Sequence, residues 1–129
     1  MSRNRRSAKQ AGASFERSIA DYLARALNDD RIDRRVKTGS KDRGDITGVR
    51  FHGKRVVLEL KDYAGSLHLP QWFREAEVEA GNDDAPIFAV IAKRKGTTDP
   101  AQQYACMPVW MLAALLVGGP ELLEDDDAD

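Results

Sequence analysis

The chain has 129 residues, of which 42% are hydrophobic and 32% are charged, and it contains one cysteine. This length favours a single compact domain, and a lone cysteine excludes an intramolecular disulfide and suits a reducing, intracellular setting. The net charge of −1 hides an asymmetry: residues 1–61 carry 16 Lys/Arg against 8 Asp/Glu, whereas residues 62–129 carry 4 against 13. A basic first half favours a polyanionic partner, although a well-solvated surface of mixed charge is the alternative reading.

The first elements are an arm and a helix. Residues 1–9 are basic and polar and predict a flexible arm, and no apolar stretch follows them as a secretion signal would require. Apolar residues at helical spacing then predict a helix over residues 11–27. These residues are Phe15, Ile19, Tyr22, Leu23, Ala26 and Leu27. Asn28-Asp29-Asp30 is expected to end the helix.

Three strands are expected next. Residues 32–38 alternate and predict a partly exposed first strand, and residues 39–44 form a Gly-rich, basic turn. Residues 45–51 predict a second strand and residues 55–62 a third, joined as a hairpin around His52-Gly53.

The second half supplies two helices and two strands. A helix from Leu69 to Gly81 is expected, with Pro70 in its first turn, and the continuously apolar residues 86–92 predict a central strand covered on both faces. Residues 103–107 predict a short last strand in which Cys106 is a small core residue. Residues 121–129 predict an acidic, disordered tail, leaving residues 10–120 as the single domain. The order α-β-β-β-α-β-β-α predicts a mixed α/β fold whose five-stranded sheet is flanked by helices.

The helix expected over residues 109–117 is apolar nearly all round. It is too short to span a bilayer, and such a helix must be buried on more than one side. We expect a homodimer that forms through Val109–Leu116, and the alternative is a helix packed entirely within the monomer.

The most informative residues are Asp45, Glu59 and Lys61. Glu59 and Lys61 share one face of the third strand, at the end of an apolar run where unpaired charges are costly to bury. Two carboxylates can hold a hard cation such as Mg²⁺, with Mn²⁺ as a substitute, and such a cation beside a phosphate assists phosphodiester hydrolysis. The alternatives are a turn residue for Asp45 and an ordinary surface pair for Glu59 and Lys61.

One register condition follows from this interpretation. A two-residue turn at His52-Gly53 pairs Asp45 with Leu60 and puts Asp45 and Glu59 on opposite faces. A shared metal therefore predicts an odd-numbered loop, such as His52-Gly53-Lys54, or a bulge.

The ordered set of motifs resembles the PD-(D/E)xK nuclease superfamily, and more narrowly the archaeal-type Holliday junction resolvases and their phage relatives. The matching residues are Phe15-Glu16, Gly39-Ser40, Gly44-Asp45-Ile46, Glu59-Leu60-Lys61 and Gln71, within residues 10–95. Gly44 stands where the superfamily has the proline of its name. The resemblance implies a restriction-endonuclease-like core and hydrolysis that leaves a 5′ phosphate and a 3′ hydroxyl.

The resemblance also implies a role for each matching residue. Asp45, Glu59 and the Leu60 carbonyl would bind the metal, Glu16 would serve a second metal or orient a water, and Lys61 would hold or activate the attacking water and steady charge on the phosphate. Ser40 would approach the backbone near the cut, and Gln71 would support Lys61 or a water.

A basic surface would bring DNA to this site through its phosphates, so shape rather than sequence would be recognised. Its expected residues are Arg3, Arg5, Arg6, Lys9, Arg34, Arg35, Lys37, Lys41, Arg43, Lys93, Arg94 and Lys95. The predicted function is a Mg²⁺-dependent, structure-selective endonuclease acting on branched DNA, most specifically four-way junctions. The alternatives are a flap, nicking or restriction-like nuclease on the same fold, or a non-catalytic nucleic-acid-binding module. We expect an intracellular (cytoplasmic) protein without a membrane segment, and phage relatives leave a phage origin open.

Overall fold

The computed structural model describes residues 4–36, 39 and 41–123. The elements in this part of the chain are α1 (Arg5–Ala26), β1 (Asp33–Arg34), β2 (Ile46–Thr47), β3 (Arg50–Phe51), β4 (Lys54–Lys61), α2 (Leu69–Asn82), β5 (Ile87–Ala92), β6 (Tyr104–Cys106) and α3 (Val109–Val117), with short 3₁₀ turns at Pro100–Gln102 and Pro120–Leu122.

Two sheets form the centre of the fold. The larger one has four strands in the order β3-β4-β5-β6, and β1 pairs with β2 in a separate antiparallel ribbon. Within the described residues only β4 and β5 are parallel, and α2 is the crossover between them. The mixed α/β class is confirmed, whereas the single five-stranded sheet is not what the described residues form.

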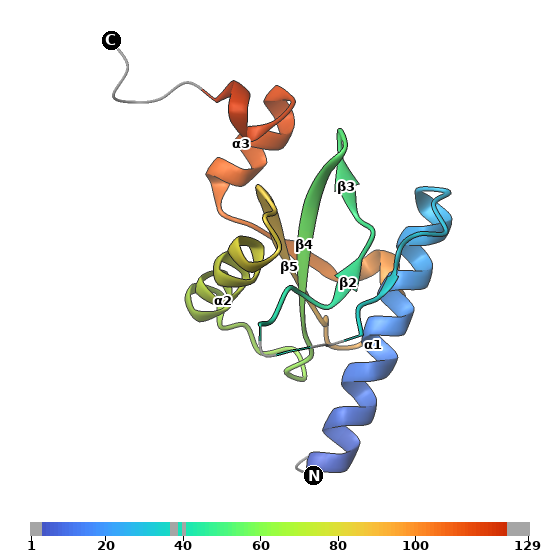
Figure 1. Cartoon of the computed structure of the whole chain (residues 1–129). Coiled ribbons are helices and arrows are strands. Elements are labelled where there is room, and N and C mark those ends of the chain that lie inside the picture. The colour runs from blue at the N-terminus through green and yellow to red at the C-terminus, as the bar shows by residue number, and fades with distance from the viewer. Residues whose placement is uncertain (1–3, 37–38, 40, 124–129) are drawn as a thin grey trace.

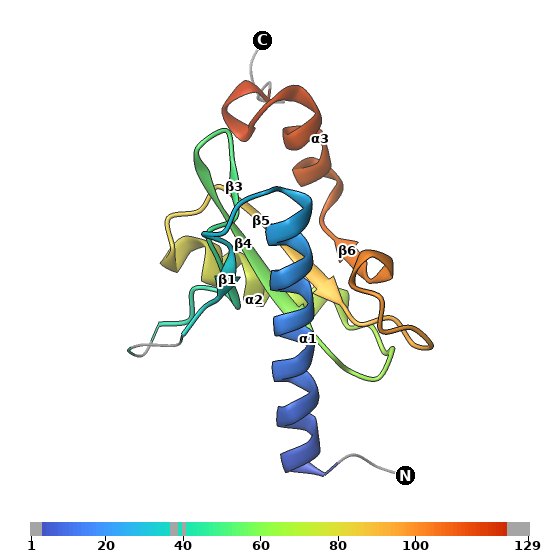
Figure 2. The ribbon, with the colours of Figure 1, turned by 90° about the vertical axis from the view of Figure 1, so that its right-hand side faces the viewer.

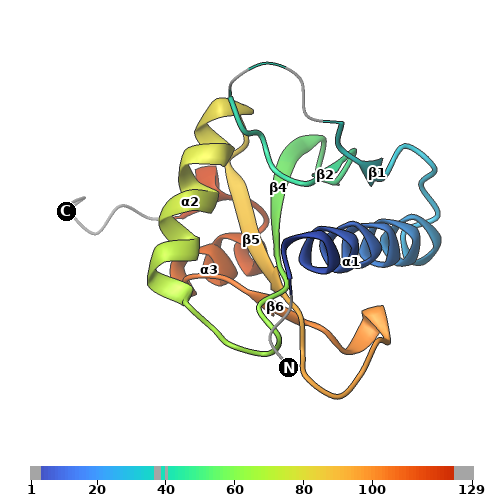
Figure 3. The same cartoon turned by 90° about the horizontal axis from the view of Figure 1, so that it is seen from below.

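Helices cover both faces of the four-stranded sheet. Figures 1 and 3 show α2 on one side of β4 and β5 and α1 on the other. Side chains therefore alternate between two cores along β4: Val57 packs with Trp72 of α2, and Leu58 packs with Ala20 of α1. The apolar run of β5 follows from this arrangement, since both of its faces are covered.

Helix α1 begins earlier than the apolar pattern predicts. Asn4 is the N-cap, and its side-chain oxygen accepts a hydrogen bond from the backbone N–H of Ser7 at 2.8 Å. The helix therefore takes in residues 5–9, which the sequence assigned to a flexible arm, and Figure 2 shows this first part of α1 extending beyond the sheet.

The second predicted strand is broken at Gly48 into β2 and β3. Gly48 has φ +87°, and a Cβ there would lie 2.3 Å from the carbonyl oxygen of Arg31. The backbones therefore touch at a point that only glycine allows. The N–H of Asp45 donates to Leu58 and the N–H of Val56 donates to Val49, so the segment 45–49 carries two residues more than the facing segment 56–58.

The hairpin between β3 and β4 has a two-residue turn. Phe51 pairs with Lys54, and His52 and Gly53 form the turn with φ values of +49° and +78°. These positive values suit the tight turns that match strand twist. The predicted odd-numbered loop is therefore wrong. The bulge around Gly48 adds two residues, and an even number of extra residues leaves Asp45 and Glu59 on opposite faces of the strands.

Helix α3 packs through one narrow face. Met111 and Ala114 are buried, whereas Val109 and Leu116 are 81% and 80% exposed. The alternative in which the whole helix is packed within one subunit is therefore wrong. Among the described residues, no helix combines the length and apolar character needed to cross a bilayer.

Candidate metal centre

Three carboxylates meet on the α2 side of the sheet. Asp42 comes from the loop before β2, Glu59 from β4 and Glu79 from α2, and one oxygen of each lies within 4.8 Å of the others. Three acidic side chains from separate segments at this spacing provide the oxygen ligands that Mg²⁺ and Mn²⁺ prefer.

Two of these carboxylates are buried with unpaired oxygens. Glu59 and Glu79 are 7% and 6% exposed, and neither Oε2 atom has a hydrogen-bond partner among the described residues. Burial of a carboxyl oxygen without a hydrogen-bond partner is unfavourable, so a cation in this position would satisfy atoms that the fold leaves unsatisfied.

Burial and the neighbouring acids disfavour ionisation of Glu79. Burial, followed by the neighbouring carboxylates of Glu59 and Asp42, raises the pKa of Glu79 to about 10. Glu79 therefore carries a proton at neutral pH when no cation is present, and a protonated Glu79 can donate to Glu59.

Lys61 lies beside one of the three acids, Glu59, and beside Glu75 of α2. Its Nζ atom is 3.4 Å from Glu59 Oε1 and 2.5 Å from Glu75 Oε2. Burial opposes the charged form, but the carboxylates of Glu75 and Glu59 outweigh it and raise the pKa of Lys61. Lys61 is therefore a fixed ammonium cation at neutral pH and is not suited to accept a proton.

Gln71 is linked to Lys61 through Glu75. Its Nε2 donates to Glu75 Oε1 at 3.0 Å, and the other oxygen of Glu75 accepts from Lys61. Lys61 lowers the pKa of Glu75, which keeps that carboxylate ionised and Lys61 in place.

Asp45 and Glu16 lie on the α1 side of the sheet instead. Asp45 Oδ2 accepts a hydrogen bond from the backbone N–H of Leu60 at 2.8 Å, and Asp45 lines a cavity together with Glu16 and Arg34. Glu16 Oε2 is ion-paired with Arg34 at 3.0 Å. The predicted grouping of Glu16, Asp45 and Glu59 is thus corrected, since the three acids that meet include only Glu59 of that set.

The predicted DNA contacts divide into exposed and paired side chains. The exposed ones are Arg5, Arg6, Lys9, Lys41, Arg43, Arg94 and Lys95. Arg34 pairs with Glu16, Arg35 pairs with Asp83, and Lys93 donates to the carbonyl of Thr97. Ser40, Arg3 and Lys37 lie outside the described residues.

The chain matches no protein-family model, no curated protein and no solved structure.

Two members of the acidic group were missed by sequence reasoning. Asp42 sits in the polar turn, where nothing in the sequence distinguishes it from a solvated residue. Glu79 did carry a signal, because it falls on the face of α2 that buries Trp72, Ala76 and Ala80. A carboxylate on an apolar helix face needs a polar neighbour, and Glu79 meets Glu59 on the face of β4 that α2 covers.

Proposed function

We propose that this chain is a metal-dependent, structure-selective DNA endonuclease. The observation that carries the proposal is the meeting of Asp42, Glu59 and Glu79 within 4.8 Å, with buried unpaired oxygens and with Lys61 alongside. Carboxylates that can hold a divalent cation, next to a fixed ammonium group, supply the charge stabilisation that phosphodiester hydrolysis needs.

Asp42, Glu59 and Glu79 would hold the divalent cation, and their oxygen donors fit Mg²⁺ or Mn²⁺. When bound, the cation acts as a Lewis acid on a phosphoryl oxygen. This assignment replaces Asp45 by Asp42 and Glu79, and it leaves Asp45 to hold the backbone of Leu60.

Lys61 would stabilise the negative charge that develops on the phosphate. Glu59 and Glu75 fix its ammonium group before substrate arrives, so little reorganisation is required. Gln71 is a positioning residue in this scheme, because it reaches Lys61 only through Glu75.

The finer parts of the proposal rest on the sequence resemblance. They are membership of the PD-(D/E)xK superfamily with its restriction-endonuclease-like core, a preference for four-way junctions, and paired cuts by a homodimer. The exposed basic side chains support binding of a phosphate backbone by shape. A flap, nicking or restriction-like nuclease on the same fold is the second candidate, since a fold does not determine its substrate.

The test is cleavage of four-way junction, flap and linear duplex DNA in Mg²⁺ or EDTA. We expect paired nicks in the junction that require Mg²⁺, and we expect Glu59→Gln and Asp42→Asn to slow cleavage about 100-fold or more. Glu77→Gln removes an exposed carboxylate from the same helix as Glu79 and serves as the matched control.

Asp45→Asn decides between the two ligand assignments. Loss of cleavage in this variant, with full activity in Asp42→Asn, would contradict the acidic group described above. Tight binding without cleavage of any of the three DNAs would instead favour the non-catalytic module.

A further inference from the structure

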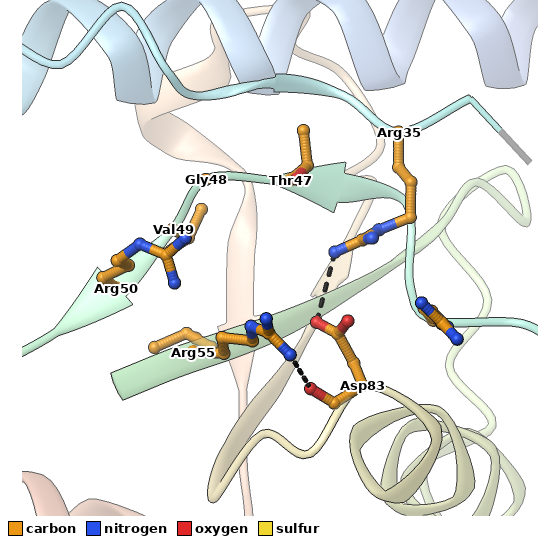
Figure 4. A pocket seen from close by; sticks show the side chains of 9 residues that line it. Arg35, Thr47, Gly48, Val49, Arg50, Arg55 and Asp83 are labelled. Atoms are coloured by element: carbon orange, nitrogen blue, oxygen red, sulfur yellow. Dashed lines mark hydrogen bonds and ion pairs between the residues drawn. The ribbon is translucent and has the colours of Figure 1, made fainter. Parts of the chain in front are cut away.

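A second site lies between the β3–β4 hairpin and the end of α2. Arg35, Arg43, Arg50 and Arg55 line a cavity of about 190 Å³ together with Asp83. Figure 4 shows Arg35 and Arg55 directed towards Asp83, with Arg50 approaching from the other end of the hollow. The four guanidinium groups come from separate segments of the chain, and Asp83 is the only acidic residue of the lining among the described residues.

Asp83 balances only part of this charge. Its Oδ2 lies 3.2 Å from Arg35 Nη2, and its backbone carbonyl accepts from Arg55 Nη1 at 3.0 Å. Within the part of the chain that the structure describes, the side chains of Arg43 and Arg50 make no hydrogen bond or ion pair, although the Asp29 carboxylate interacts electrostatically with Arg50, and the buried Nε of Arg35 has no acceptor. The cavity is therefore short of acceptors and rich in donors.

The fold holds these like charges together. Gly48 also lines the cavity, and its contact with the backbone of Arg31 creates the break that separates β2 from β3. Side chains on both sides of the break converge on the end of α2 as a result. Four guanidinium groups around one hollow repel one another, and an anion in the hollow would relieve that repulsion.

We propose that this pocket binds a phosphate group. Guanidinium groups present paired N–H donors that match the oxygens of a phosphate, and 190 Å³ is several times the roughly 30 Å³ taken by a water molecule. A phosphate there would accept hydrogen bonds from the side chains of Arg43 and Arg50, which have no other acceptor among the described residues.

The position of the pocket indicates which kind of molecule supplies the phosphate. Arg43 directly follows Asp42, and Asp83 lies one helical turn beyond Glu79. Two of the three acids are therefore close in sequence to residues that line the pocket. The pocket holds a backbone phosphate that flanks the one to be cut and so positions the strand. This second statement rests on the proposed function, whereas phosphate binding itself does not.

The experiment uses the full chain in EDTA, so that it does not depend on cleavage. Thermal melts in inorganic phosphate are compared with melts in chloride at equal ionic strength, and the affinity for a labelled four-way junction is measured over a range of salt. The variants are Arg50→Gln and Arg55→Gln, both at exposed positions, and the control is Arg25→Gln, an exposed arginine at the end of α1.

We expect phosphate to raise the melting temperature of the wild type and of Arg25→Gln, and to lose this effect in Arg50→Gln. We expect the slope of log affinity against log salt to fall by about 1 for each pocket arginine removed. Equal stabilisation of all variants by phosphate would overturn the site. Loss of phosphate binding with unchanged junction affinity would assign the pocket to a free phosphate compound and overturn the DNA assignment.

A failure here can be told from a failure of the proposed function. Phosphate binding in EDTA is independent of the acidic group, and Glu59→Gln should leave it unchanged. Circular dichroism without phosphate shows whether each variant is folded, and loss of repulsion should keep Arg50→Gln at least as stable as the wild type.

Discussion

The position of one side chain, that of Glu79, indicates the candidate metal site. Its helix face is otherwise apolar, and its carboxyl group lies among Glu59 and Asp42 with an unpaired buried oxygen. The fold tolerates this arrangement without a cation only because Glu79 keeps its proton, as its pKa of about 10 implies. A cation would displace that proton, so metal binding and pH are coupled at this residue.

Glu79→Gln tests this coupling through stability. An unfolded Glu79 loses its proton near its ordinary pKa of 4.5, whereas the folded one keeps it up to about pH 10. The folded state therefore binds the extra proton between these values, and the stability of the metal-free wild type falls as pH rises through this window. The glutamine side chain of the variant does not titrate, so this part of the pH dependence should disappear.

Thermal melts in EDTA at pH 5 and pH 9 measure the effect. We expect Glu79→Gln to gain melting temperature relative to the wild type at pH 9 and to differ little from it at pH 5. Glu77→Gln, at an exposed position, should show no such change. The same difference at both pH values would contradict the raised pKa.

Gly48 determines how residues 45–51 divide between the two sheets. The sequence predicts one strand over residues 45–51, but the contact of Gly48 with the backbone of Arg31 breaks it into two short strands. The break separates the ribbon of β1 and β2 from the four-stranded sheet and places Gly48 in the lining of the arginine pocket. A local turn residue thereby controls which strands belong to which sheet.

Gly48→Ala should be strongly destabilising. The added Cβ would meet backbone atoms at 2.3 Å and 2.7 Å, and φ +87° disfavours any side chain. We expect a loss of at least about 2 kcal/mol in the free energy of unfolding, measured by urea denaturation.

Gly81→Ala is the matched control. It lies within α2, and a Cβ there would have no neighbour within 4 Å. Replacement of a helical glycine by alanine should stabilise the protein by about 0.5–1 kcal/mol. A similar loss in both variants would show that the close approach at Gly48 is not the cause.

The arrangement of the layers leaves one helix incompletely covered. Helices α1 and α2 pack on opposite faces of the sheet, whereas α3 buries Met111 and Ala114 and exposes most of its other apolar side chains. The exposed residues of this region include Val109, Trp110, Leu112, Leu116, Val117 and Leu122. An apolar surface of this kind is typical of a subunit interface. We propose that a second copy of this chain covers it, in the homodimer predicted through Val109–Leu116.

Leu116→Lys tests the dimer. A lysine at this 80% exposed position places a charge within the proposed interface, so light scattering should detect a dimer for the wild type and a monomer for the variant. Val78→Lys changes an exposed apolar residue on α2 and should leave the dimer intact. A wild type that is monomeric at all concentrations would contradict the interface.

Local patterns were sufficient for most of the elements. The helices at Leu69–Asn82 and Val109–Val117 and the strands at Lys54–Lys61 and Ile87–Ala92 follow from the spacing of apolar residues, with Pro70 near the start of α2. Burial of Glu59 and its proximity to Lys61 also follow, since both stand on one face of a strand within an apolar run. These features are visible in the pattern of neighbouring residues in the chain, even though packing against distant segments produces the burial.

The partners of Glu59 depend on contacts between distant segments. Which acids meet it is decided by the two-residue turn at His52-Gly53, by the break at Gly48 and by the face on which α2 packs. None of these can be read from spacing, because a shift of one residue in a strand exchanges its faces. The local pattern is therefore enough to predict a buried carboxylate and a lysine together at the end of β4. Long-range packing is what brings Asp42 and Glu79, rather than Asp45 and Glu16, to Glu59.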